Sequence, residues 1–163
     1  MISESQYNDA VKSYARNIFR FVFKNLKDKD ASEDLVQDCF MKLWQNRASV
    51  DSSKIKSWLF SVAHHAMINY AKAEARKTSL DNAEVNLLST GSLPEPDLKE
   101  LIEKSLQELT PLQRSIILLR DFEGYNYKEI GDILKLSEPQ VKVYLFRARQ
   151  RMKDSIKTLS AVL

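Results

Sequence analysis

The stretch NYKEIGDILKLSEPQVKVYLFRARQRMK, residues 126–153, shows the pattern of two short helices joined by a tight turn. Asn126 and Glu129 are spaced as a capping box, which predicts where the first helix begins. Ser137 and Gln140 repeat that spacing and predict the start of a second helix. A short helix, a turn and a second helix in this order are typical of a helix-turn-helix unit.

The second predicted helix has an apolar stripe on one side and a cationic face on the other. The stripe recurs at helical spacing and consists of Val141, Leu145, Ala148, Met152 and Ile156. Facing away from it are Pro139, Val143, Phe146, Arg147 and Gln150, with Lys142 and Lys153 at the flank. Such a face suits the major groove of DNA. The alternative is an ordinary helical hairpin with a solvated charged face.

The composition of the whole chain favours an all-α fold. The 163 residues include 44% hydrophobic residues but only three Gly and four Pro, so long helices are permitted nearly everywhere. Net charge is +4 over residues 1–77, −4 over residues 78–97 and +3 over residues 98–163. We therefore expect two small helical domains, 1–77 and 98–163, joined by an acidic, flexible linker at 78–97.

Three helices are predicted in the first domain, over 4–26, 30–44 and 54–77, with Asp30 and Glu33 capping the second. The first of them carries a basic row with a four-residue repeat, which we interpret as a solvated face: Lys12, Arg16, Arg20 and Lys24. In the second domain, helices are predicted over 98–109 and 110–122, ahead of the helix-turn-helix. In the linker, a transient contact through Val85, Leu87 and Leu88 is the one structural feature expected.

Two features of the first domain indicate binding partners. Asp34 and Asp38 lie one turn apart on the outward side of their helix, where like charges repel unless a cationic surface faces them. Phe60 stands among cations beside the polar loop 46–53, where an exposed aromatic ring could receive an unstacked base. Packing of Phe60 in the core is the alternative interpretation.

The sequence offers little that enzyme chemistry would need. It has no Gly-rich phosphate loop, and the adjacent His64 and His65 diverge by about 100° on a helix, so they cannot share one metal. Cys39 is the only cysteine and falls on an apolar stripe, which predicts a buried inert thiol. We expect no catalysis, cofactor, metal or small-molecule substrate. Without an apolar run of about 20 residues or a signal-peptide pattern, a cytoplasmic protein is expected.

Two separate stretches resemble one protein family. SEDLVQDCFMKLW (32–44) followed by IKSWLFSVAHHAMINYAKAEARK (55–77) resembles region 2 of a bacterial sigma-70 family sigma factor, and LTPLQRSIILLRDFEGYNYKEIGDILKLSEPQVKVYLFRARQRMK (109–153) resembles region 4. The short chain with only a linker between them is similar to the extracytoplasmic-function (ECF) group. The resemblance implies a factor that binds core RNA polymerase and directs promoter-specific initiation by recognising −35 and −10 elements and helping to melt the −10 region.

The resemblance also implies three sets of site residues. The first would bind the clamp coiled coil of the polymerase: Asp34, Leu35, Gln37, Asp38, Met41 and Lys42. The second would bind the −10 element: Arg47, Ser49, Lys54, Lys56, Phe60, Asn69, Lys72, Arg76 and Lys77. The third would bind the −35 element: Ser137, Pro139, Gln140, Lys142, Val143, Phe146, Arg147 and Arg149. Further implied partners are the polymerase flap and an anti-sigma factor.

The chain departs from the family pattern at two places in the second helix. Val143-Tyr144 stands where many members carry Ser-Arg, and Pro139 replaces a usual small residue, so −35 specificity is not carried over. Two other functions fit parts of the sequence. One is a free-standing helix-turn-helix regulator whose N-terminal helices sense or dimerise, and the other is an interaction protein of helical hairpins that binds no DNA.

Overall fold

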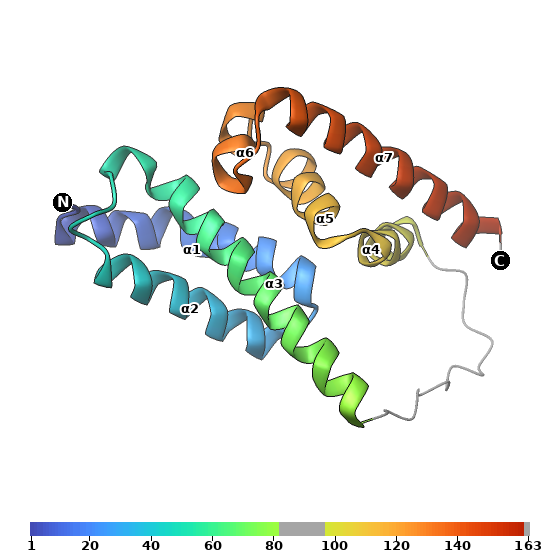
Figure 1. Ribbon diagram of the computed structural model, residues 1–163, viewed down its shortest axis with the longest axis horizontal. Coiled ribbons are helices and arrows are strands. Elements are labelled where there is room, and N and C mark those ends of the chain that lie inside the picture. The colour runs from blue at the N-terminus through green and yellow to red at the C-terminus, as the bar shows by residue number, and fades with distance from the viewer. Residues whose placement is uncertain (82–96, 162–163) are drawn as a thin grey trace.

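The computed structural model describes residues 1–81 and 97–161, and its regular elements there are helices (Figure 1). The N-terminal unit contains α1 (Glu4–Leu26), α2 (Lys29–Gln45), the 3₁₀ turn η1 (Ser52–Lys54) and α3 (Ile55–Asp81). The C-terminal unit contains α4 (Leu98–Glu108), α5 (Pro111–Ile117), the π-helical turn η2 (Leu118–Phe122), α6 (Tyr127–Leu134) and α7 (Glu138–Ala161). This confirms the all-α prediction for the described residues. The predicted contact through 85, 87 and 88 lies outside them.

Local capping explains where the N-terminal helices begin and end. Ser3 and Gln6 form a reciprocal capping box at α1, and Lys27 ends that helix in the left-handed region at φ 56°. Asp28, whose backbone is still extended, caps α2 by accepting a 3.0 Å hydrogen bond from the Ala31 amide. The prediction that Asp30 caps α2 was wrong, because Asp30 already lies inside the helix.

Helix α3 is longer than the sequence predicted. It runs to Asp81, so residues 78–81 belong to the helix and not to the connector that we expected from Thr78. The Thr78 hydroxyl donates to the Glu74 carbonyl at 3.0 Å, which satisfies the threonine within the helix. Nothing in this stretch stops a helix, since the glycine and prolines of the connector come only from Gly91 onward.

The C-terminal unit depends on two glycines at its turns. Gly124 follows η2 with φ 75°, a conformation that favours glycine, and redirects the chain towards α6. Gly131 lies where α6 meets the turn: a Cβ there would stand 2.5 Å from the Leu136 carbonyl oxygen. The Leu136 amide donates to the Gly131 carbonyl at 2.9 Å, and Lys135 adopts φ 60°. This close approach sets the angle between α6 and α7.

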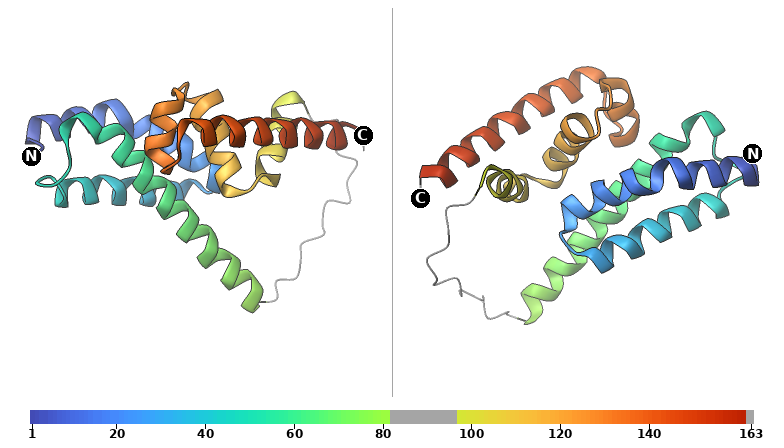
Figure 2. Two further views of the ribbon diagram at one scale, coloured as in Figure 1. Left: turned by 45° about the horizontal axis from the view of Figure 1, so that its top comes forward. Right: turned by 180° about the vertical axis from the view of Figure 1, so that it is seen from behind.

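The two units pack against each other. Helix α6 lies beside α3, and α5 with η2 lies beside α1, while α7 packs on α4, α5 and α6 (Figures 1 and 2). Large side chains on both sides are completely buried, including Phe21 and Phe60 from the first unit and Ile116 and Leu119 from the second. The described chain is therefore two helical units in direct contact.

Candidate nucleic-acid and polymerase interfaces

Both predicted capping boxes of the helix-turn-helix are present. The Glu129 amide donates to Asn126 Oδ1 at 2.8 Å, and the Asn126 amide donates to Glu129 Oε1 at 3.2 Å. Likewise, the Gln140 amide donates to Ser137 Oγ at 3.2 Å, and the Ser137 amide donates to Gln140 Oε1 at 2.9 Å. Ser137 and Gln140, both in the predicted −35 set, thus hold the N-terminus of α7.

Helix α7 presents its predicted outer face to solvent. On the inner side Val141, Leu145 and Ala148 are at most 2% exposed. On the outer side Phe146 is 70% exposed and Val143 45% exposed. The polar and remaining members of the outer face are also exposed: Pro139, Lys142, Arg147 and Gln150. A rigid helix whose free face combines apolar side chains with cations can enter a DNA major groove.

Arg149 differs from the rest of the predicted −35 set. Its guanidinium donates to both carboxylate oxygens of Asp121, at 3.1 and 2.5 Å, and this bond raises the arginine pKa. Asp121 belongs to η2, so the pair fastens α7 to the rest of the C-terminal unit. Arg151 makes a similar link to Gln113 at 3.1 Å. Arg149 therefore has a supporting position beside the outer face.

The polymerase-binding residues predicted on α2 form one exposed acidic side of the N-terminal unit. Asp34, Gln37, Asp38 and Lys42 are exposed, and Met41 is 56% exposed, while Leu35 is buried beneath them. Two further acids, Asp28 and Asp30, line the same depression as Asp34 and Asp38. Four carboxylates along one groove make a surface suited to a cationic partner.

Most of the predicted −10 residues are also accessible. Lys54, Asn69, Lys72, Arg76 and Lys77 are exposed, the last four along α3. In the loop after α2, the exposed Ser49 donates its hydroxyl to the Asn46 carbonyl at 3.2 Å. Arg47 stacks on the ring of Trp44 at 3.4 Å, so its guanidinium is held in place while still partly exposed.

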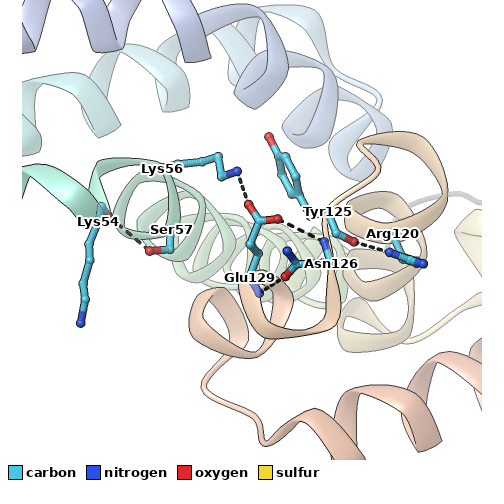
Figure 3. Close-up of polar contacts among 7 residues, drawn as sticks. All are labelled: Lys54, Lys56, Ser57, Arg120, Tyr125, Asn126 and Glu129. Carbon is cyan, nitrogen blue, oxygen red and sulfur yellow. Dashed lines mark hydrogen bonds and ion pairs between the residues drawn. The ribbon is translucent and has the colours of Figure 1, made fainter.

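Phe60 and Lys56 are not on a free surface. Phe60 is 0% exposed and packs edge-on between Phe21, at a ring distance of 5.5 Å, and Tyr125, at 5.2 Å. Of the two interpretations of Phe60, packing in the core is confirmed and an exposed ring is excluded, because α6 and its preceding loop cover this side of α3. Lys56 forms an ion pair with Glu129 and lies 4.5 Å from the Tyr125 ring (Figure 3).

His64 lies at the same junction. Its Nδ1 is 2.8 Å from the Ser115 hydroxyl of α5, and burial lowers its pKa to about 4. Sequence reasoning did not predict this contact. It also missed that the basic row of α1 contributes to the contact: Arg20 donates to both Glu123 carboxylate oxygens, at 3.3 and 3.0 Å, and Lys24 Nζ lies 4.9 Å from the centre of the Phe122 ring. The four-residue repeat of cations was the available signal.

Within residues 1–81 and 97–161, no helix is long and apolar enough to cross a membrane, and no group of three or more metal-ligating side chains is present. Cys39 is 1% exposed, as predicted, and burial raises the pKa of its thiol to about 11. A thiol with this pKa is almost entirely protonated at neutral pH and is a poor nucleophile.

Comparison with known proteins identifies both units. Residues 7–77 match the Sigma-70 region 2 family and residues 99–152 match the Sigma-70, region 4 family. The ECF RNA polymerase sigma factor SigM of Bacillus subtilis (strain 168) is 33% identical over 150 residues, which cover 90% of this chain and 92% of SigM. The ECF RNA polymerase sigma-E factor of Escherichia coli (strain K12) is 25% identical over 171 residues, covering 96% and 89%.

A solved structure shares the fold. The sigma factor RpoE from Bartonella quintana, crystallised in complex with the anti-sigma factor NepR, has a TM-score of 0.74 and 24% sequence identity, over 93% of this chain and 96% of RpoE.

A region 2 unit and a region 4 unit with an exposed helix-turn-helix, together on one chain, define a DNA-binding transcription initiation factor. The chain belongs to the sigma-70 family. Within that family its relatives place it in the ECF group, and its function is promoter-specific transcription initiation. This assignment replaces the two alternative functions considered from sequence, a free-standing regulator and an interaction protein that binds no DNA.

Proposed function

We propose that residues 1–77 and 98–163 act as two promoter-binding domains on one polymerase-bound chain. The exposed outer face of α7 carries the proposal, since its cations and apolar side chains are supported from behind by a buried stripe. The predicted −35 residues would place this face in the major groove, with Arg149 supporting it from the flank. Lys and Arg at the groove supply salt-dependent affinity, while contacts to base edges supply sequence choice.

The N-terminal domain would contribute polymerase binding and −10 recognition. The acidic side of α2 with Met41 suits the clamp coiled coil, and the loop containing Arg47 and Ser49 would hold a flipped base of the −10 element. Along α3, Asn69 and the cations after it would follow the DNA strand. Unstacking a base costs a few kcal/mol, which is offset when the protein binds the released bases. No covalent step is required.

We also assign partners and a location. The clamp coiled coil and the flap of core RNA polymerase would hold the two domains, and promoter DNA would bind both. RpoE was crystallised with an anti-sigma factor, and this chain shares its fold, so a protein of that kind is a further proposed partner. A factor that works on polymerase and chromosomal DNA belongs in the cytoplasm.

Charge reversal on α2 tests the polymerase-binding part. Asp34→Lys combined with Asp38→Lys should abolish pull-down of purified core polymerase and transcription from a promoter library, because two carboxylates facing a cationic partner become cations. Glu4→Lys with Asp9→Lys makes the same charge change on exposed positions of α1 and should leave both activities intact. Undiminished polymerase binding by the α2 variant would refute the assignment of this surface.

A further inference from the structure

Ile2 precedes α1 and is completely buried, although it belongs to no helix. Its backbone amide donates a 2.9 Å hydrogen bond to the carbonyl of Arg47, which lies in the loop between α2 and η1. The segment before α1 and this loop lie side by side in both views of the molecule (Figures 1 and 2). The loop, residues 46–51, is therefore attached to a segment that is distant from it in the sequence.

The 46–51 loop has few other means of keeping its position. Its remaining hydrogen bonds among the described residues are local, such as the 3.1 Å bond from the Val50 amide to the Asn46 carbonyl. Local bonds shape the turn but do not fix it relative to the helices. Val50, which is 6% exposed, anchors one end of the loop in the core. The bond from Ile2 holds the other end, and Ala48 and Ser49 are exposed between the two anchors.

The side chain of Arg47 is held from the same helix. The Tyr7 hydroxyl of α1 donates to the Phe40 carbonyl at 3.1 Å, and the Tyr7 ring packs edge-on against Trp44 at a ring distance of 5.0 Å. The Arg47 guanidinium lies 3.4 Å from the centre of the Trp44 ring. Arg47 is thus fixed twice, through its carbonyl by Ile2 and through its guanidinium by Trp44.

Ile2 is itself firmly connected to α1. The next residue, Ser3, forms the capping box of that helix: its amide donates to Gln6 Oε1 at 2.9 Å, and its hydroxyl oxygen accepts from the Gln6 amide at 3.1 Å. The connection from the rigid start of α1 to the Arg47 carbonyl is therefore only one residue long. A loop held in this way loses less conformational freedom when it binds a ligand.

We propose that Ile2 is a positioning residue for −10 recognition. Its buried side chain and its amide keep the 46–51 loop in the conformation that accepts a flipped base. Ile2 does not touch the DNA, since its side chain is 0% exposed, and it acts through Arg47. This inference rests on the proposed −10 role of Arg47 and Ser49.

Base selectivity separates positioning from a purely structural role. If Ile2 only stabilised the fold, its truncation would lower the folded fraction and would reduce activity on every promoter by the same factor. A displaced loop instead changes the difference in free energy between the preferred base and its competitors. The ratio of strand-opening rates on promoters that differ in one base is therefore the informative measurement.

The experiment uses the full-length protein with core polymerase. The promoter is one selected from a random library by the unaltered holoenzyme, and each −10 position is changed in turn to the other three bases. Strand opening is followed with a fluorescent label in the melted segment. Arg47→Ala identifies the position at which the loop selects a base. Ile2→Ala should lower selectivity at that position about tenfold, because recognition groups lose discrimination when they are not held in place. Selectivity at other positions and affinity for the −35 duplex should not change.

Ile18→Ala is the matched control, because it truncates another completely buried isoleucine further along α1. It should preserve base selectivity even where it slows opening. Far-UV circular dichroism checks that each variant is folded. If Ile2→Ala does not fold, Ile2→Val takes its place, with an expected loss of selectivity of about twofold.

Three outcomes overturn the proposal. The first is full selectivity in a folded Ile2 variant. The second is a double variant, Ile2→Ala with Arg47→Ala, that is less selective than Arg47→Ala alone, since a residue that acts through Arg47 has no further effect once Arg47 is truncated. The third is an Arg47→Ala variant with unchanged selectivity at every −10 position. That result refutes the base-binding role of the loop itself, whereas the first two refute only the role of Ile2.

Discussion

Helix α7 exposes Phe146 by 70% and Val143 by 45%, whereas α3 buries Phe60 completely under the neighbouring domain. Both helices carry apolar side chains next to cations on a face that sequence reasoning assigned to DNA. On α7 that face is supported from behind by Val141 and Leu145 and has nothing packed in front of it among the described residues. On α3 the equivalent face meets Tyr125 and Glu129.

The difference shows that exposure of an apolar side chain depends on the domain opposite it. The proposed −35 surface is therefore exposed on α7, whereas two residues of the proposed −10 set, Lys56 and Phe60, are in contact with the other domain.

The largest effect is expected for Arg147→Ala, on the exposed outer face of α7. Removing this cation from the outer face of α7 should weaken binding to a −35 duplex by about 1–3 kcal/mol at fixed salt. The duplex is one selected from a random library by the unaltered protein, and affinity is measured by fluorescence anisotropy. Arg16→Ala, which removes a cation from α1, is the control and should change affinity little. Unaltered binding by Arg147→Ala would contradict the groove assignment.

Acidification should weaken the contact between the two domains, which covers one face of α3. We call the described arrangement, with the two domains in contact, the closed state, and the arrangement with the domains apart the open state. In the closed state the His64 pKa is lowered from 6.5 to about 4, mainly because His64 is buried, so the closed state binds fewer protons than the open state. The advantage of closure is complete above about pH 6.5 and declines as the pH falls towards 4. Arg114, which lines the same pocket from α5, and the neighbouring His65 add positive charge, while α1 contributes the uncharged Asn25 and Leu26.

The expected loss of closure between pH 7 and pH 5 is about 2 kcal/mol, from about 1.4 kcal/mol per pKa unit. Small-angle X-ray scattering should show the radius of gyration increasing over this range. His64→Leu is the control, since an uncharged apolar side chain should keep the domains closed at both pH values. An expansion that persists in His64→Leu would assign the pH response to other groups.

Local sequence patterns predicted the helices and most of their starts, but they did not predict the contact between the two domains. The capping boxes at Asn126 and Ser137 involve residues three apart, so their hydrogen bonds follow from the sequence alone. Asp28 was overlooked because another aspartate, Asp30, stands two positions later. The burial of Phe60 could not be predicted in this way. A helical pattern shows that a face is apolar, but not whether the neighbouring helix comes from the same domain or the other.

The cations of α1 also differ in their surroundings. The repeat through Arg20 was visible in the sequence, and its interpretation as a solvated face is correct for the exposed Lys12 and Arg16. Arg20 instead meets Glu123, which is distant in the sequence and lies in a loop whose path no local pattern sets. Long-range ion pairs of this kind depend on how two domains meet, and single-sequence periodicity carries no information on that.

The smallest effect is expected at Tyr125, and it should tighten the closed state. The Tyr125 hydroxyl is buried without a hydrogen-bond partner among the described residues; Asn17 lies near it but does not meet hydrogen-bond geometry, and burial raises the hydroxyl pKa to about 12. Tyr125→Phe keeps the ring that packs on Phe60 and removes the unpaired group, which should favour closure by about 1 kcal/mol. The salt concentration that opens the domains, followed by scattering, should rise.

Tyr70→Phe provides the matched control, because Tyr70 lies beside the acidic groove of α2 and α3 and not at the junction. It should leave the salt midpoint unchanged. If Tyr125→Phe lowered the midpoint instead, the hydroxyl would have to be making a favourable contact, for instance with Asn17 or with water. The Tyr125 hydroxyl would then have a hydrogen-bond partner that the described residues do not show, and separating the two domains would cost more free energy.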